Sequence, residues 1–234
     1  MTSDGSHFAE TRWTLVARSR GGDTEASVAL SELCKVYYAP VVAFLRREGR
    51  GEDAARELAH DFFARLLEGG AIDGARPGRG KFRSYLLGAL KHFAADQRDR
   101  ALSAKRGGGA EHAGIDGETG IADESVESPE LAFDRQWALT LLGRAMSRLE
   151  AEMRANGKSD QFDALNPWLT HDAETTPQSL AAETLGMSVE AVKVAIHRLR
   201  KRFREAVKAE IANTVKEPAD VREELDALMS SMRR

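Results

Sequence analysis

Cysteine is almost absent from the sequence, which has only Cys34 among its 234 residues. A single cysteine cannot form an internal disulfide, and in its apolar surroundings Cys34 is expected to be a buried small hydrophobe. No run of the chain approaches the ~18 apolar residues of a membrane span. Residues 1–13 lack the basic start and apolar core of a secretory signal. These absences favour a protein of the reducing cytoplasm with no membrane span.

Signals for strands and for catalysis are also scarce. The chain has no long alternating run of β-branched residues and is rich in Ala, Leu, Arg and Glu, so an all-α fold is predicted. The six histidines are scattered, with no HExxH, no Cys/His cluster and no GxxxxGKS/T loop. Glu57, His60 and Asp61 stand at helical spacing, but a metal site is the weaker interpretation of them. We therefore expect no enzymatic activity, no cofactor and no bound metal.

Residues 179–204 predict a short helix, a turn and a longer helix. Gly186 tolerates the positive φ of a tight turn, and Ser188 is a natural N-cap. The second helix carries one apolar stripe, made of Val189, Val192, Ile196, Leu199 and Phe203. Residues 188–205 have a local net charge of +4, although the chain as a whole is at −3. This pattern favours a DNA-binding helix-turn-helix, and two packed helices with a solvated charged face are the alternative.

A second basic segment spans residues 76–106, with nine Lys/Arg against two Asp. Residues 81–100 are predicted to form a helix whose apolar stripe is Phe82, Tyr85, Leu86, Leu90 and Phe93. Basic charge attracts phosphates, and planar side chains stack on unpaired bases. Lys91, His92 and Asp96 lie off the apolar stripe and are the better candidates for such contacts.

The segment 107–134 combines six glycines with eight acidic residues and no Lys or Arg. Low hydrophobicity and charge of one sign cannot support a packed core, so a flexible acidic linker is predicted. The predicted division is a first domain at 1–106, the linker at 107–132, a second domain at 133–210 and a helical tail at 211–234. The linker is either a solvated spacer or a segment that folds over the basic surfaces and competes with DNA. The tail is expected to dock on the chain's own body rather than to receive a partner.

Apolar periodicity predicts the remaining helices. They span residues 25–47, 52–68, 129–155 and 161–169, after a first helix that begins at Thr11. Pro40 falls inside one of them, where its missing N–H is expected to kink or divide the helix. The prediction is therefore of helices throughout, interrupted by glycine-rich segments.

Two parts of the sequence resemble one family. The DNA-binding end of bacterial sigma factors of the extracytoplasmic-function (ECF) group is similar to residues 179–205, SLAAETLGMSVEAVKVAIHRLRKRFRE. The first domain of these factors, which contacts core RNA polymerase and opens promoter DNA, is similar to ELAHDFFARLLE (57–68) followed by KFRSYLLGALKHFAADQRDR (81–100). The resemblance covers roughly residues 11–106 and 133–209.

The resemblance implies a role for each part. The helix over 57–68 would dock on the clamp helices of the polymerase's largest subunit through Glu57, His60, Asp61 and Arg65. The basic helix would hold the melted −10 element through Lys81, Arg83, Lys91, His92, Asp96, Arg98 and Arg100. The last helix would face the −35 element through Lys193, Val194, His197 and Arg198, with Arg200 and Lys201 near phosphates. The partners would be promoter DNA and core polymerase, including its flap, and catalysis would stay with the polymerase.

The chain also departs from the family pattern. Many relatives have an acidic run before the leucine of the docking helix, where this chain has AARE at residues 54–57. The chain looks like a subgroup linked to Ser/Thr kinases, and a phosphate would add about −1.5 to −2 charge at pH 7. Ala59 leaves no hydroxyl in the middle of this helix, so the sequence does not give a site for such a phosphate. A Ser/Thr kinase, an anti-sigma protein and the C-terminal tail are the alternatives for control. Ala195 stands where relatives often have a basic residue, which is expected to alter promoter preference.

A stand-alone helix-turn-helix regulator, which binds operator DNA without polymerase, is the alternative function. Its first half would serve dimerisation or sensing, and it would usually bind a two-fold operator. The segment that separates the two functions is KFRSYLLGALKHF, because a repressor does not need a basic helix with interleaved aromatic residues.

Overall fold

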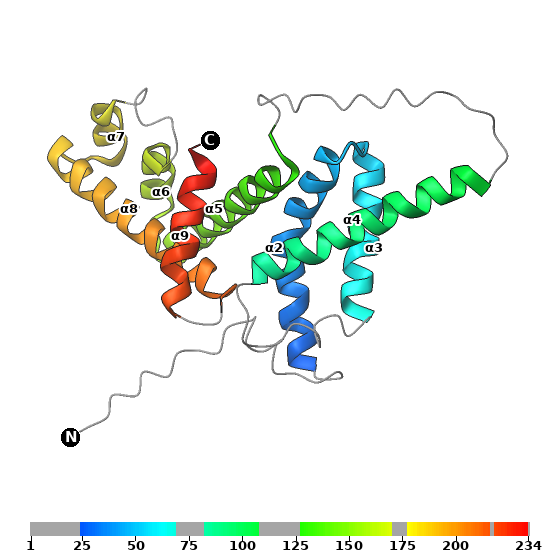
Figure 1. Ribbon diagram of the computed structural model, residues 1–234. Coiled ribbons are helices and arrows are strands. Elements are labelled where there is room, and N and C mark those ends of the chain that lie inside the picture. Colours follow the sequence, from blue (N-terminus) through cyan, green and yellow to red (C-terminus); the bar gives the residue numbers. More distant parts are fainter. Residues whose placement is uncertain (1–23, 69–81, 108–126, 170–176, 216–217, 234) are drawn as a thin grey trace, which may run out of the picture. The chain divides into compact units, whose positions relative to one another are not determined.

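The computed structural model describes five ranges of the chain: 24–68, 82–107, 127–169, 177–215 and 218–233. Every regular element in these ranges is helical, which confirms the all-α prediction for the described residues. The elements are α2 (Thr24–Arg47), α3 (Glu52–Glu68), α4 (Phe82–Gly107), α5 (Pro129–Ala155), α6 (Ser159–Leu165), the 3-10 helix η1 (Asn166–Leu169), α7 (Gln178–Leu185), α8 (Val189–Ala212) and α9 (Pro218–Met232) (Figure 1). The predicted helix from Thr11 lies outside the described residues, as do Lys81 and most of the predicted linker. None of the described helices combines the length and apolar character needed to cross a membrane.

The helices form two compact units. Unit 1 contains the described residues up to Ala138 and from Thr214 onward, and unit 2 contains residues 139–213. The first turns of α5 therefore belong to unit 1 and the rest of α5 to unit 2, whereas the sequence predicts a second domain that starts at residue 133, directly after the linker. The C-terminal helix α9 packs as part of unit 1, where Leu228 is buried.

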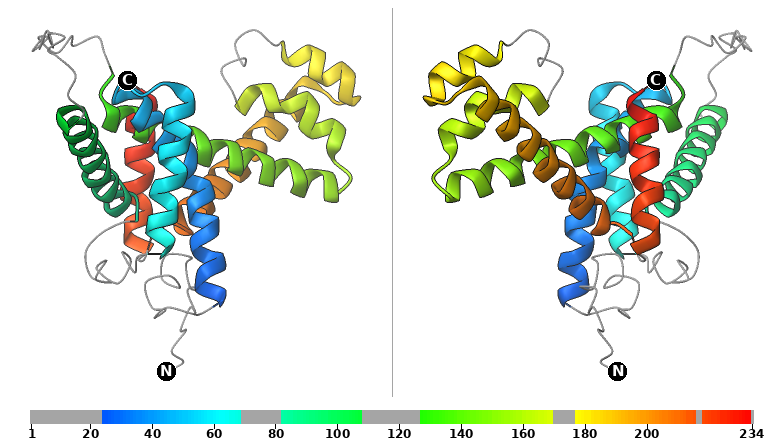
Figure 2. Two further views of the ribbon diagram at one scale, coloured as in Figure 1. Left: turned by 90° about the vertical axis from the view of Figure 1, so that its right-hand side faces the viewer. Right: turned by 90° about the vertical axis from the view of Figure 1, so that its left-hand side faces the viewer.

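In unit 1, α4 crosses α2 and α3 (Figure 1) and lies to one side of them (Figure 2). Aromatic side chains form contacts between these helices. The rings of Tyr37 on α2 and Phe82 on α4 meet edge to face, with centroids 5.1 Å apart. Phe62 on α3 and Phe93 on α4 meet in the same way at 5.5 Å. All four side chains are buried, so the predicted apolar faces of these helices do form the core.

Pro40 does not divide α2, which is continuous from Thr24 to Arg47. The residue is itself buried, and Tyr37 and Val41 beside it are fully buried. Of the two expected outcomes, a kink or a division of the helix, the division is therefore wrong. Burial of the apolar face around the proline outweighs the one hydrogen bond that it removes.

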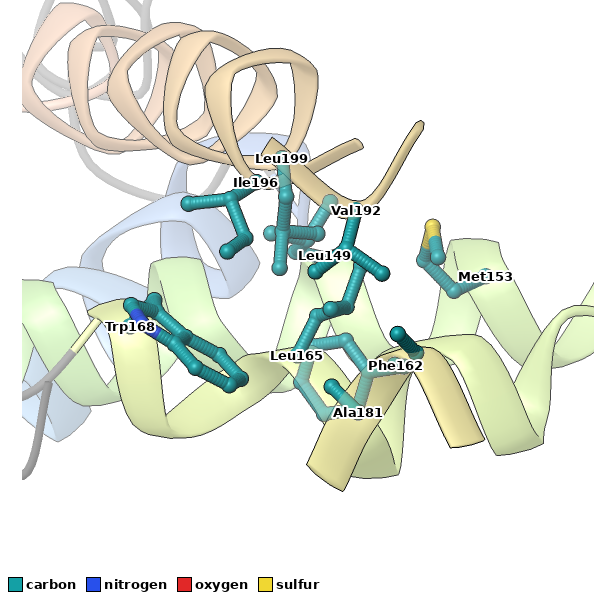
Figure 3. Close-up of a cluster of buried hydrophobic side chains, with 10 residues drawn as sticks. Leu149, Met153, Phe162, Leu165, Trp168, Ala181, Val192, Ile196 and Leu199 are labelled. Carbon is teal, nitrogen blue, oxygen red and sulfur yellow. The ribbon is translucent and has the colours of Figure 1, made fainter. Parts of the chain in front are cut away.

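The core of unit 2 lies beneath α8, which packs on α6, η1 and α7 (Figure 3). Val192, Ile196 and Leu199 are the α8 side chains of this core, as the apolar stripe predicts. Val189, which the stripe also included, is 38% exposed. The other buried members are Leu149, Met153, Phe162, Leu165, Trp168, Ala181 and Ala182.

The only cysteine, Cys34 on α2, is half-buried rather than fully buried. Burial raises the pKa of its thiol to about 11, so the reactive thiolate is scarce at neutral pH. We expect iodoacetamide at pH 8 to alkylate the native protein about 100-fold more slowly than the urea-unfolded protein, in proportion to the thiolate fraction. Mass spectrometry after timed quenching measures both rates. Equal rates would show that the surroundings of Cys34 open freely.

Candidate nucleic-acid interfaces

The turn between α7 and α8 is held by specific hydrogen bonds. Gly186 ends α7 with φ +61°, a left-handed conformation that glycine adopts without strain. The amide of Met187 donates to the carbonyl of Ala182 at 2.9 Å. The Ser188 Oγ then accepts a hydrogen bond from the amide of Ala191 at 3.2 Å, which caps α8. Both the predicted turn residue and the predicted cap are therefore in place.

The face of α8 opposite the core is exposed and cationic. It presents all six residues that the sequence assigned to the −35 element: Lys193, Val194, His197, Arg198, Arg200 and Lys201. Two of the cations already have partners. Lys193 pairs with Glu190 at 2.9 Å, and Arg200 Nε donates to the carbonyl oxygen of Trp168 at 3.0 Å. The second bond ties α8 to η1 while the rest of the face stays open to solvent.

A pocket of about 460 Å³ in unit 2 adjoins the exposed face of α8. Lys158, Arg198 and Arg202 line it with positive charge, and Leu165 contributes apolar surface. Ala195 also lines this pocket. The contribution of Lys158 was not predictable from the sequence, since this residue precedes α6 and no local pattern connects it with α8.

The residues assigned to the −10 element divide between two faces of α4. Lys81 lies outside the described residues. The first face is formed by positions that follow each other at steps of eight and seven, namely Arg83, Lys91 and Arg98. The second face is formed by positions at steps of four, namely His92, Asp96 and Arg100. All three residues of the second face are exposed, whereas those of the first face have carboxylate partners.

The Arg83 side chain is only 15% exposed and is held by two other helices of unit 1. Its Nε lies 2.9 Å from Glu224 Oε2 and its second terminal nitrogen 3.1 Å from Oε1, so α9 accepts the guanidinium in bidentate fashion. From α5, Asp134 accepts another hydrogen bond and the Trp137 ring lies 4.7 Å below the guanidinium carbon. Burial alone opposes the charged form, but the bonds to Glu224 outweigh it and raise the pKa of Arg83 above its ordinary value.

Two further carboxylates meet the first face of α4. Lys91 Nζ lies 2.7 Å from Glu130, in the first turn of α5. The hydrogen bond from Lys91 lowers the pKa of Glu130, so this carboxylate is ionised at neutral pH. Arg98 lies 2.8 Å from Glu48, just after α2. Every cation of the first face therefore has a carboxylate partner outside α4.

The residues assigned to polymerase binding lie on the exposed side of α3: Glu57, His60, Asp61 and Arg65. His60 Nε2 lies 3.1 Å from the Tyr38 hydroxyl, and the two rings stack with centroids 5.3 Å apart. The Arg65 guanidinium lies over the Phe93 ring at 5.2 Å. In the ranges that the structure describes, no group of three or more His, Cys, Asp and Glu side chains is arranged to hold a metal ion.

Comparisons with protein-family models, with curated proteins and with solved structures give no match for this chain. The function is therefore inferred from the exposed faces of α3, α4 and α8.

Proposed function

We propose that the chain is a sigma factor of the ECF group, which binds core RNA polymerase, directs it to specific promoters and helps to melt the −10 element. The observation that carries the proposal is the pair of cationic helices in separate compact units, α4 in unit 1 and α8 in unit 2. A sigma factor needs two such helices because it holds two separated promoter elements. Along the chain, the predicted acidic linker (residues 107–132) joins α4 to the start of α5, and α5 continues into unit 2.

In unit 2, α7 and α8 would form a helix-turn-helix that reads the −35 element. The buried stripe packs one side of α8 on the core, and the Ser188 cap fixes where the helix begins. The opposite, exposed face would enter the major groove. Arg198 is suited to a bidentate contact with guanine, and Val194 to a thymine methyl group. Lys201 is suited to a phosphate, which positions the helix without reading sequence.

In unit 1, the second face of α4 would hold the melted −10 strand. His92 and Arg100 offer planar groups on which unpaired bases stack, and Asp96 accepts hydrogen bonds from base amino groups. The exposed side of α3, with Glu57 and Asp61, would dock on the clamp helices of the polymerase's largest subunit. Unit 2 would meet the flap, and an anti-sigma protein or a Ser/Thr kinase would control the factor.

A stand-alone regulator is the second candidate, and the complete, capped α7–α8 arrangement favours it. Such a protein would bind operator duplex tightly without polymerase. It would give the exposed His92, Asp96 and Arg100 of α4 no role, whereas a sigma factor uses them. The sigma function therefore accounts for more of the molecule.

Run-off transcription with core polymerase on a genomic promoter library tests the proposal. Added protein, both before and after phosphatase treatment, is expected to produce transcripts that start at a shared promoter sequence. The absence of promoter-specific starts in both samples would overturn the sigma function. Tight, sequence-specific duplex binding without polymerase would favour the stand-alone regulator.

Within this assay, Arg198→Ala is expected to lower promoter-specific initiation about tenfold or more, because a good contact between a side chain and a base contributes about 1–3 kcal/mol. Arg154→Ala is the matched control, since Arg154 is exposed in the same unit but lies on α5, where it pairs with Glu150 at 2.7 Å. Run-off yields from the strongest promoter measure both variants. Equal losses for the two variants would contradict a base contact by Arg198.

A further inference from the structure

The first face of α4, formed by Arg83, Lys91 and Arg98, is covered by carboxylates of unit 1. None of these carboxylates belongs to α4. The carboxylate partners of the first face come from the segment after α2, from the start of α5 and from α9. They are Glu48, Glu130, Asp134 and Glu224. Asp134 and Glu224 are 51 and 141 residues away from Arg83 in sequence. Distant parts of the chain thus converge on one basic helix face.

A carboxylate offers these cations what a DNA phosphate offers them. Each group carries negative charge and accepts hydrogen bonds through more than one oxygen, and arginine binds both in bidentate geometry. The contact of Glu224 with Arg83 is of this kind, with both carboxylate oxygens engaged at 2.9 and 3.1 Å. Glu130 and Asp134 also lie at the end of the acidic segment 107–134, whose charge is of one sign. The first face therefore already holds the ligand chemistry that a nucleic acid strand would bring.

We propose that these four carboxylates form a cover over the first face of α4, in the places that DNA phosphates would take. A single strand of promoter DNA would then bind this face only by displacing the carboxylates. The inference rests on the proposed function, which assigns the −10 strand to α4. The second face remains exposed, so the uncomplexed protein keeps part of its strand-binding surface. Displacement of the carboxylates would couple strand capture to the release of α5 and α9 from α4.

The three sets of contacts differ in how readily they open. The side chains of Lys91 and Glu130 are 51% and 39% exposed, so water and salt weaken this pair. The Arg98 side chain is 54% exposed and is accessible in the same way. Arg83 and Glu224 are 15% and 1% exposed, and separating them would leave an uncompensated buried charge. The ion pairs of Lys91 and Arg98 would therefore break first, and the contact between Arg83 and Glu224 of α9 would break last.

Binding of a fluorescent single-stranded DNA of about 20 nucleotides to the full-length protein tests this cover. The double variant Glu48→Gln/Glu130→Gln releases Lys91 and Arg98 while leaving the buried contacts of Arg83 intact. We expect about tenfold tighter binding at low salt. We also expect the plot of log affinity against log salt to steepen by about 1.4, since each phosphate contact on a single strand contributes about 0.7. Adding Asp134→Asn and Glu224→Gln should steepen this slope by about 0.7 more. If this quadruple variant loses its helical circular dichroism, the test depends on the double variant only.

The control is Asp53→Asn/Asp226→Asn, which makes the same change in net charge at two exposed positions of unit 1. Its salt dependence should match that of the unmodified protein. The proposed cover would be ruled out if the salt slope of Glu48→Gln/Glu130→Gln did not change, or if the control variant showed the same change in slope. Run-off transcription separates this result from the function. If the protein initiates transcription but the salt slope of the double variant does not steepen, the cover is ruled out and the promoter role stands. If the slope steepens but the protein does not initiate transcription, the cover is supported and the promoter role is ruled out.

Discussion

Arg83→Ala is expected to lower the free energy of unfolding of unit 1 by about 3–5 kcal/mol, because it removes one partner of a buried ion pair. Glu224, which is 1% exposed, would keep its charge without the guanidinium, and Trp137 would lose the cation above its ring. Urea unfolding followed by circular dichroism measures the loss. Hydrogen–deuterium exchange should show reduced protection in α9 and α4, with peptides of unit 2 as the internal reference.

Two variants control this experiment. Arg56→Ala removes an arginine whose ion pair with Glu52, at 2.6 Å, is exposed, and its effect should stay within about 0.5 kcal/mol. Arg83→Met/Glu224→Leu removes both buried charges together and should recover most of the stability that Arg83→Ala loses. If Arg83→Ala costs no more than Arg56→Ala, the buried contacts of Arg83 do not hold unit 1 together.

Ile196→Ala is expected to lower the free energy of unfolding of unit 2 by about 2–5 kcal/mol. Ile196 is 4% exposed and points from α8 into the core, toward the same cluster as Leu165 and Leu199 (Figure 3). The substitution leaves a cavity that close-packed neighbours fill only in part. Hydrogen–deuterium exchange of α7 and α8 peptides measures the effect, and promoter-specific initiation should fall because α8 is no longer held in place.

Val194→Ala is the matched control, since it shortens an aliphatic side chain on the same helix. Val194 is 49% exposed, so the free energy of unfolding should change by no more than about 0.5 kcal/mol. Promoter preference should nevertheless change, because Val194 lies on the face assigned to the −35 element. Equal destabilisation by the two substitutions would mean that α8 is not oriented with Ile196 inward and Val194 outward.

The positions of the helices were predictable because apolar periodicity and capping are local properties of the sequence. The helix predicted over 52–68 coincides with α3, and the one over 129–155 coincides with α5. The turn at Gly186 and the cap at Ser188 follow from residue types that suit those backbone positions. The outward direction of the −35 set follows in turn from the buried stripe of α8.

The contacts of the −10 set were not predictable in the same way. Periodicity shows that Arg83 lies beside the apolar stripe of α4, but not which distant segment packs there. Its partner Glu224 belongs to α9, which was predicted only as a helical tail that docks on the chain's own body, with no residue-level partner. The boundary between the two units was not predictable either. It falls after Ala138, inside the continuous helix α5, and no local sequence signal marks that residue.

The bidentate contact of Arg83 with Glu224, above the ring of Trp137, has a consequence for evolution. A lysine has one compact ammonium group and cannot present the planar fork that contacts two carboxylates above an indole ring. In related chains, an arginine at position 83 should therefore accompany acidic residues at 134 and 224 and an aromatic residue at 137. Relatives that end before α9 should have another residue at position 83. Covariation of these four positions would mark the branch of relatives in which the C-terminal helix and the basic helix have evolved together.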